Sequence, residues 1–64
     1  MRRRSVRITI EMVAVIKLLV IRLHFYQHEA AAIFGINQGR VSEIITGKRF
    51  ADVPMATTLP PGLI

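Results

Sequence analysis

Basic side chains and side chains that both donate and accept hydrogen bonds are concentrated in residues 37–49 of this 64-residue chain. On a helix they would form one exposed face: Asn37, Gln38, Arg40, Ser42 and Glu43, followed by Lys48 and Arg49. Amide, hydroxyl and guanidinium groups match the donors and acceptors of base edges, and basic groups match phosphates. A solvated helix can carry the same residue types. The stretch is therefore a candidate nucleic-acid-binding surface, with an ordinary exposed face as the alternative.

Residues that could support catalysis or bind a metal are few. His24 and His28 are four residues apart, a spacing that can bind a metal on one helix face. We expect a helix break between them, and only Glu29 lies near as a further ligand. No nucleophile is paired with a base, and the chain has no cysteine. We therefore expect no enzymatic activity, no metal and no other cofactor.

The segment that must position the polar stretch is the long apolar one, residues 9–26. Thr9 is a suitable N-cap and Glu11 suits the helix dipole, so we expect a helix from Ile10 to Phe25. On a helical wheel its apolar side chains form two arcs. The broad arc holds Met12, Val13, Val15, Ile16, Leu19, Val20 and Leu23, and the narrow arc holds Ala14, Leu18, Ile21 and Phe25. Because a surface helix usually has one apolar stripe, two arcs predict one face toward the core and one toward a second subunit; alternatively, both pack within one domain.

The two ends of the chain differ from the middle, which leaves residues 9–50 as the expected folded domain. Residues 1–8 are a basic arm, and the alternation of polar and apolar side chains from Ser5 to Met12 is typical of a half-buried strand. Such a strand would pair with the same segment of a second subunit; the alternative is an extended arm that leads into the helix. Residues 51–64 hold all three prolines and no periodic pattern, so we expect a flexible tail.

Composition and charge restrict the class of partner. Nine basic residues stand against four acidic ones, a net charge of +5, which suits a polyanion such as nucleic acid or an anionic membrane surface. The apolar run Met12–Ile21 is much shorter than the roughly 20 residues of a membrane-spanning helix. Hydrophobic residues make up 52% of the chain, a high fraction for one small domain that suggests burial against a partner. We expect a cytoplasmic protein, associated with the nucleoid and not with a membrane.

The most specific signal is a twenty-residue pattern, Gln27–Thr46. Ala31 is small enough for two helices to cross closely, and Gly35 can adopt the left-handed turn conformation. Asn37 can cap the second helix, and Gly47 can end it. The spacings that face a shared core are apolar: Ala30, Phe34, Ile36, Val41 and Ile44. In this register the stretch resembles the helix-turn-helix of phage repressor and Cro-like (Xre-type) regulators, and it predicts a small all-α domain of about three helices.

The resemblance implies that residues 38–46 form the helix that enters the major groove, N-terminal end first. In such regulators Gln38 would contact a base, while Gln27 would contact a phosphate and brace Gln38. Gly39 and Ser42 would lie on the side that faces the groove, where a glycine lets the backbone approach closely.

Charged side chains near this helix would make the remaining contacts. Arg40 could reach a phosphate or a guanine. Glu43 could accept a hydrogen bond from cytosine N4 or pair with Arg40, three residues earlier. Lys48 and Arg49 would hold phosphates. Arg2, Arg3 and Arg4 would follow the DNA backbone or enter the minor groove, with a disordered arm as the alternative.

Two features depart from the family pattern. Family members usually have further helices after the motif, whereas little that could form a helix follows Phe50. The segment Leu23–Tyr26 contains no Gly, Pro, Ser or Asn, so a longer continuous helix is an alternative to a break before Gln27.

The missing burial predicts a homodimer, formed through residues 10–25 and possibly residues 4–8. Such a dimer would read two half-sites about 34–36 Å apart on double-stranded DNA, as a small transcriptional regulator. A second hypothesis is a helix-turn-helix module for protein interaction, of the antitoxin or anti-activator type, that does not read DNA.

Overall fold

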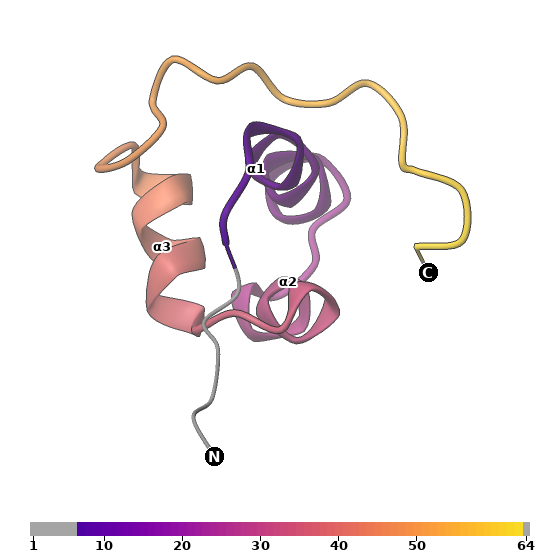
Figure 1. The fold of residues 1–64 in the computed structure, drawn as a ribbon, viewed down its shortest axis with the longest axis horizontal. Helices are drawn as coiled ribbons and strands as arrows, with labels where there is room; N and C mark the ends of the chain where they lie inside the picture. Colours follow the sequence, from indigo (N-terminus) through magenta and orange to yellow (C-terminus); the bar gives the residue numbers. More distant parts are fainter. Residues whose placement is uncertain (1–6, 64) are drawn as a thin grey trace.

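The computed structural model describes residues 7–63 and consists of three α-helices and one π-helical turn (Figure 1). Helix α1 spans Ile10–Lys17 and continues directly into the π-helical turn η1, Leu18–Arg22. Helix α2 spans Gln27–Phe34, and helix α3 spans Gln38–Thr46. No strand occurs within residues 7–63, so the predicted all-α fold of about three helices is confirmed.

The start of α1 follows the sequence prediction. The Thr9 hydroxyl accepts a hydrogen bond from the Met12 backbone N–H at 3.2 Å, and the helix begins at Ile10. This cap satisfies one of the backbone donors that have no partner in a first helical turn. Residues 7–9 belong to no helix or strand, and the backbone of Thr9 is extended. The expected arm, including Arg2, Arg3 and Arg4, falls mostly on residues 1–6, which lie outside the described residues.

The first helix ends earlier than the predicted Phe25, and the way in which it ends was not foreseen. In η1 the helix widens, so that the Leu23 N–H donates to the Leu18 carbonyl at 3.0 Å and the Phe25 N–H to the Leu19 carbonyl at 2.9 Å. His24 then takes a left-handed conformation, φ +62°, which directs the chain out of the helix. The break therefore exists without Gly or Pro, and the alternative of one continuous helix through Gln27 is wrong.

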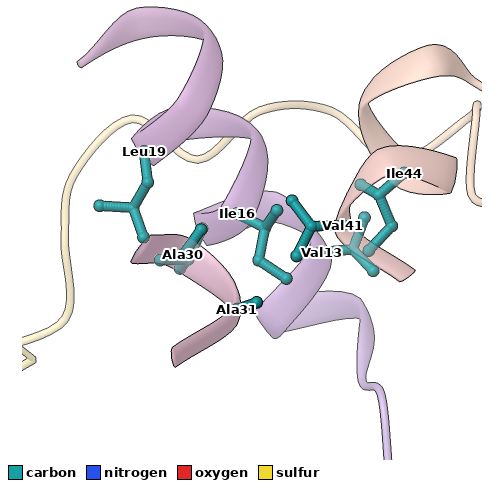
Figure 2. Packing of buried hydrophobic residues seen from close by; sticks show 8 residues of the cluster. Val13, Ile16, Leu19, Ala30, Ala31, Val41 and Ile44 are labelled. Carbon is teal, nitrogen blue, oxygen red and sulfur yellow. The ribbon is translucent and has the colours of Figure 1, made fainter. Parts of the chain in front are cut away.

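The core lies where the three helices meet, as the close view in Figure 2 shows. Figure 1 shows α1 and α2 almost end-on, while α3 runs across them on one side. Ile16 and Leu19 point from the first helix toward the two alanines of α2, Ala30 and Ala31. Val13 of the first helix lies beside α3, and all five side chains are buried. From α3, Val41 and Ile44 complete the cluster. The two alanines leave room for the larger side chains of the first helix.

Residues 51–63, here called the C-terminal segment, have no regular secondary structure but are held against α1. The Ala56 N–H donates to the Ala14 carbonyl at 3.0 Å. The Lys17 ammonium donates to the Phe50 carbonyl at 2.9 Å and to the Val53 carbonyl at 2.6 Å. Four apolar side chains of the segment pack against the core: Val53, Ala56, Leu59 and Leu63. These contacts supply burial that we expected from a second subunit.

Much of both predicted apolar arcs of the first helix is covered within the single chain, whereas the contact with a second subunit stays a prediction. Val15 and Leu18, one from each predicted arc, are both buried within the single chain. The C-terminal segment crosses α1 beside Ala14, a member of the narrow arc. The alternative that both arcs pack inside one domain therefore describes most of this helix. Among the described residues, the large apolar side chains that stay exposed are Ile10, Ile21, Leu23 and Tyr26.

Candidate nucleic-acid interface

The turn between α2 and α3 has the geometry that the glycine at its centre predicts. Gly35 is left-handed, with φ +67°. The Ile36 N–H donates to the Ala31 carbonyl at 3.0 Å, and the Gly35 N–H donates to the Ala32 carbonyl at 3.3 Å. This pair of bonds is the Schellman arrangement, which satisfies the carbonyls at a helix end. The predicted turn is confirmed, and it brings α3 against α2.

The polar start of α3 is fixed by its N-cap. The Asn37 side-chain oxygen accepts a hydrogen bond from the Gly39 backbone N–H at 2.6 Å, as predicted for a capping residue. At the other end Gly47 is left-handed, with φ +83°, and the Lys48 N–H donates to the Glu43 carbonyl at 2.9 Å. Both ends of α3 therefore agree with the sequence prediction of residues 38–46.

The outward face of α3 carries the expected polar side chains. Because Val41 and Ile44 are buried in the core, the opposite side of the helix faces away from the domain. Gln38, Gly39 and Arg40 are exposed, whereas Ser42 and Glu43 are half-buried. Figure 1 shows α3 at one side of the molecule, with its outer side uncovered by the described chain.

Four of the predicted site residues lie together around one hollow of about 330 Å³: Asn37, Gly39, Arg40 and Glu43. An Arg40 guanidinium nitrogen lies 3.7 Å from Glu43 Oε1, so the i,i+3 pairing predicted as one alternative for Glu43 is present. This separation is an ion-pair contact, longer than a hydrogen bond. Glu43 Oε1 is shielded from solvent and has no hydrogen-bond partner among the described residues. The carboxylate therefore keeps an unused acceptor.

The other predicted contacts are more scattered. Lys48 and Arg49 follow Gly47, the C-cap of α3, and are exposed. The Arg49 guanidinium lies 5.5 Å from the centre of the Phe50 ring, over its face. Gln27 is the first residue of α2 and is half-buried. Within residues 7–63 no hydrogen bond joins Gln27 to Gln38, and the bracing contact that the resemblance implies for the DNA-bound state stays a prediction.

Two residues near this surface were not singled out from the sequence. Thr46 lies on the outward side of α3, four residues after Ser42, and donates its hydroxyl hydrogen bond to the Ser42 carbonyl at 2.8 Å. Its helical spacing from Ser42 was a usable signal. Lys17 would have looked like a basic residue open to DNA, but its ammonium group is committed to the Phe50 and Val53 carbonyls. The only sequence signal for Lys17 was its position inside an apolar run.

Charge on the domain is more balanced than the whole chain suggests. Apart from Arg2, Arg3 and Arg4, six basic residues remain against four acidic ones. Much of the electrostatic attraction to a polyanion therefore depends on the arm, which lies outside the described residues, and on the short run Lys48-Arg49 beside α3.

Other kinds of site find little support in the described part of the chain. The break at His24 separates it from His28, whose ring stacks on Tyr26 with 5.5 Å between ring centres. Residues 7–63 contain no cluster of three or more potential metal ligands. Over the same range, no helix has the length and apolar character needed to cross a membrane.

Comparison with known proteins gives no assignment, because no family model, curated protein or solved structure matches this chain.

Proposed function

We propose that this chain binds double-stranded DNA in a sequence-specific manner through α3 and acts as a small transcriptional regulator of the repressor or Cro-like kind. The observation that carries the proposal is the α2–turn–α3 unit. In this unit α3 is capped, packs against the core through Val41 and Ile44, and has a polar outer face. A helix of this diameter fits the major groove of B-form DNA. Exposed Gln38 and Arg40 have the donors and acceptors that base edges recognise.

The contacts divide into two kinds with different consequences. Gln38, Gly39 and Ser42 would approach base edges, so that their replacement changes which sequence is preferred. Lys48 and Arg49 would hold phosphates, and their replacement would weaken binding to all duplexes alike. Gln27 and Asn37 would contribute at the ends of the motif, where backbone N–H groups of a helix start can also meet a phosphate.

Selection of bound duplexes from a random pool, followed by fluorescence anisotropy on the selected site, tests the proposal. Gln38→Ala should lose preference for the selected site, and Lys48→Ala should lower affinity for selected and scrambled duplexes by a similar factor. Glu11→Gln, which alters an exposed residue of α1, serves as the control. Enrichment of no sequence, together with no binding to any duplex at low salt, would exclude DNA binding.

We further propose that the chain acts on DNA as a homodimer. The support is the set of apolar side chains that stay exposed on or next to the first helix: Ile10 at 62%, Ile21 at 46% and Leu23 at 42%. The C-terminal segment already covers part of α1, so a dimer would use the ends of this helix more than its middle. Light scattering after size-exclusion chromatography measures the mass directly. A monomer at micromolar concentration would refute the dimer but would leave the proposal that α3 binds DNA untouched.

A second candidate function is a protein-interaction module that does not read DNA. Exposed Leu23 and Tyr26, the latter 68% accessible, favour it because they flank the break before α2 rather than the outer face of α3. The two candidates separate on one measurement: Gln38→Ala and Lys48→Ala leave partner binding unchanged in an interaction module but impair a DNA reader.

A further inference from the structure

The hollow on the outer face of α3 combines an acceptor and a donor at close range. Its walls are Asn37, Gly39, Arg40 and Glu43. The Arg40 guanidinium and the Glu43 carboxylate lie 3.7 Å apart on successive turns of the helix. Gly39 contributes no side chain, and a Cβ added there would come within 3.0 Å of Asn37 Oδ1, the atom that caps the helix. A side chain at this position would therefore press on the atom that caps the helix.

The Glu43 carboxylate lacks a hydrogen-bond donor among the described residues of the hollow. Its Oε1 atom is shielded from solvent yet accepts no hydrogen bond among the described residues. The Glu43 side chain as a whole is 40% exposed, and an ionised carboxylate has two acceptor oxygens, so a rotation of this group would present an acceptor to a ligand that supplies an N–H or O–H group. Arg40, beside it, has spare donors, because a guanidinium carries five N–H groups.

A C·G base pair offers the complementary set. In the major groove, cytosine presents the N4 amino donor, and its paired guanine presents the N7 and O6 acceptors. No other base pair puts an amino donor beside two acceptors of one purine in this order. We infer that Glu43 and Arg40 act as one unit that reads a C·G pair, with Glu43 accepting from cytosine N4 and Arg40 donating to the guanine. This inference rests on the proposed DNA binding and names the base pair that the outer face of α3 selects.

The pairing favours base recognition over phosphate binding by Arg40. The Glu43 carboxylate lowers the net charge that this helix face offers to a phosphate, while the exposed pair is weak enough for the guanidinium to donate to a base as well. The pairing therefore assigns Arg40 to sequence recognition and leaves the phosphate contacts to Lys48 and Arg49.

The inference is tested on the full chain by changing the protein residue and the base pair, separately and together, and comparing the binding affinities. Duplex selection with the wild-type protein should return a site with an invariant C·G pair. Replacing that pair by T·A should weaken binding by about 5- to 150-fold, the usual range for loss of a good base contact. In Glu43→Gln, the same base-pair change should cost less than about 3-fold, while the penalties at other positions of the site stay as in the wild type.

Glu11→Gln is the matched control, because it removes the same charge from an exposed carboxylate on α1 and should retain the full penalty. Circular dichroism of both variants establishes that they are folded. If Glu43→Gln keeps the full C·G preference, or if the selected site has no C·G pair whose preference depends on Glu43, the inference is overturned while DNA binding stands. If neither the wild type nor the control binds any duplex, the proposed function itself fails.

Discussion

Lys17 connects α1 to the C-terminal segment, and its replacement by methionine is the most informative perturbation of the fold. The Lys17 ammonium donates to the Phe50 and Val53 carbonyls at 2.9 and 2.6 Å, and the side chain is half-buried. Lys17→Met keeps the apolar stem and removes both hydrogen bonds. Hydrogen bonds to charged groups contribute about 1.5–3 kcal/mol each. Since the site is partly solvated and one ammonium serves both carbonyls, we expect a total loss of about 2 kcal/mol.

A loss of this size is large for a domain of 64 residues. At about 0.05–0.15 kcal/mol per residue, its free energy of unfolding is about 3–10 kcal/mol. For small domains each kcal/mol moves the melting temperature by about 4–8 °C, so Lys17→Met should lower it by about 8–16 °C. Thermal and urea unfolding followed by circular dichroism measure both quantities.

Lys48→Met is the matched control, because Lys48 is exposed and its side chain makes no hydrogen bond among the described residues. We expect it to change the free energy of unfolding by less than about 0.5 kcal/mol, as surface substitutions usually do. If Lys17→Met is as mild as Lys48→Met, the C-terminal segment is not held by Lys17, and the account of how this segment packs is wrong.

Three further substitutions test backbone conformation and the basic arm. His24→Gly should raise the free energy of unfolding by about 0.5–1 kcal/mol, because φ is +62° and the side chain is exposed; no gain in urea denaturation would contradict the left-handed exit from η1. Gly35→Ala should lower it by about 1 kcal/mol, since φ is +67° there, and the same titration measures the loss. Replacing Arg2, Arg3 and Arg4 together by alanine should make the slope of log affinity for DNA against log salt shallower by about 2.7 per chain if each contacts a phosphate. An unchanged slope would remove the arm from the interface.

The sequence predicted α2, α3 and the turn between them well, because their determinants are local. Asn37, Gly35 and Gly47 each act within a few residues, through a cap or a left-handed backbone that glycine adopts without strain. The pairing of Arg40 with Glu43 followed from helical spacing in the same way.

The end of the first helix and the course of the C-terminal segment could not be predicted, because both depend on tertiary contacts. A positive φ is uncommon outside glycine, and although His adopts it more often than most residues, His24 alone did not predict the residue at which the helix would end. Residues 51–63 lack periodicity, and what holds them is Lys17, 33 and 36 residues earlier in the chain than its two acceptors. For the same reason the sequence did not show that the C-terminal segment covers part of the core.

The long sequence separation between Lys17 and the carbonyls that it binds has a kinetic consequence. The α2–α3 unit closes over a three-residue turn, whereas the contacts of Lys17 close loops of 33 and 36 residues, which costs more chain entropy. We expect the local unit to form first and the C-terminal segment to dock after the transition state. Contacts made that late leave the folding rate almost unchanged and slow unfolding, so a 2 kcal/mol loss in Lys17→Met corresponds to unfolding about 30-fold faster. The C-terminal segment would then determine how long each molecule stays folded, and not how quickly it folds.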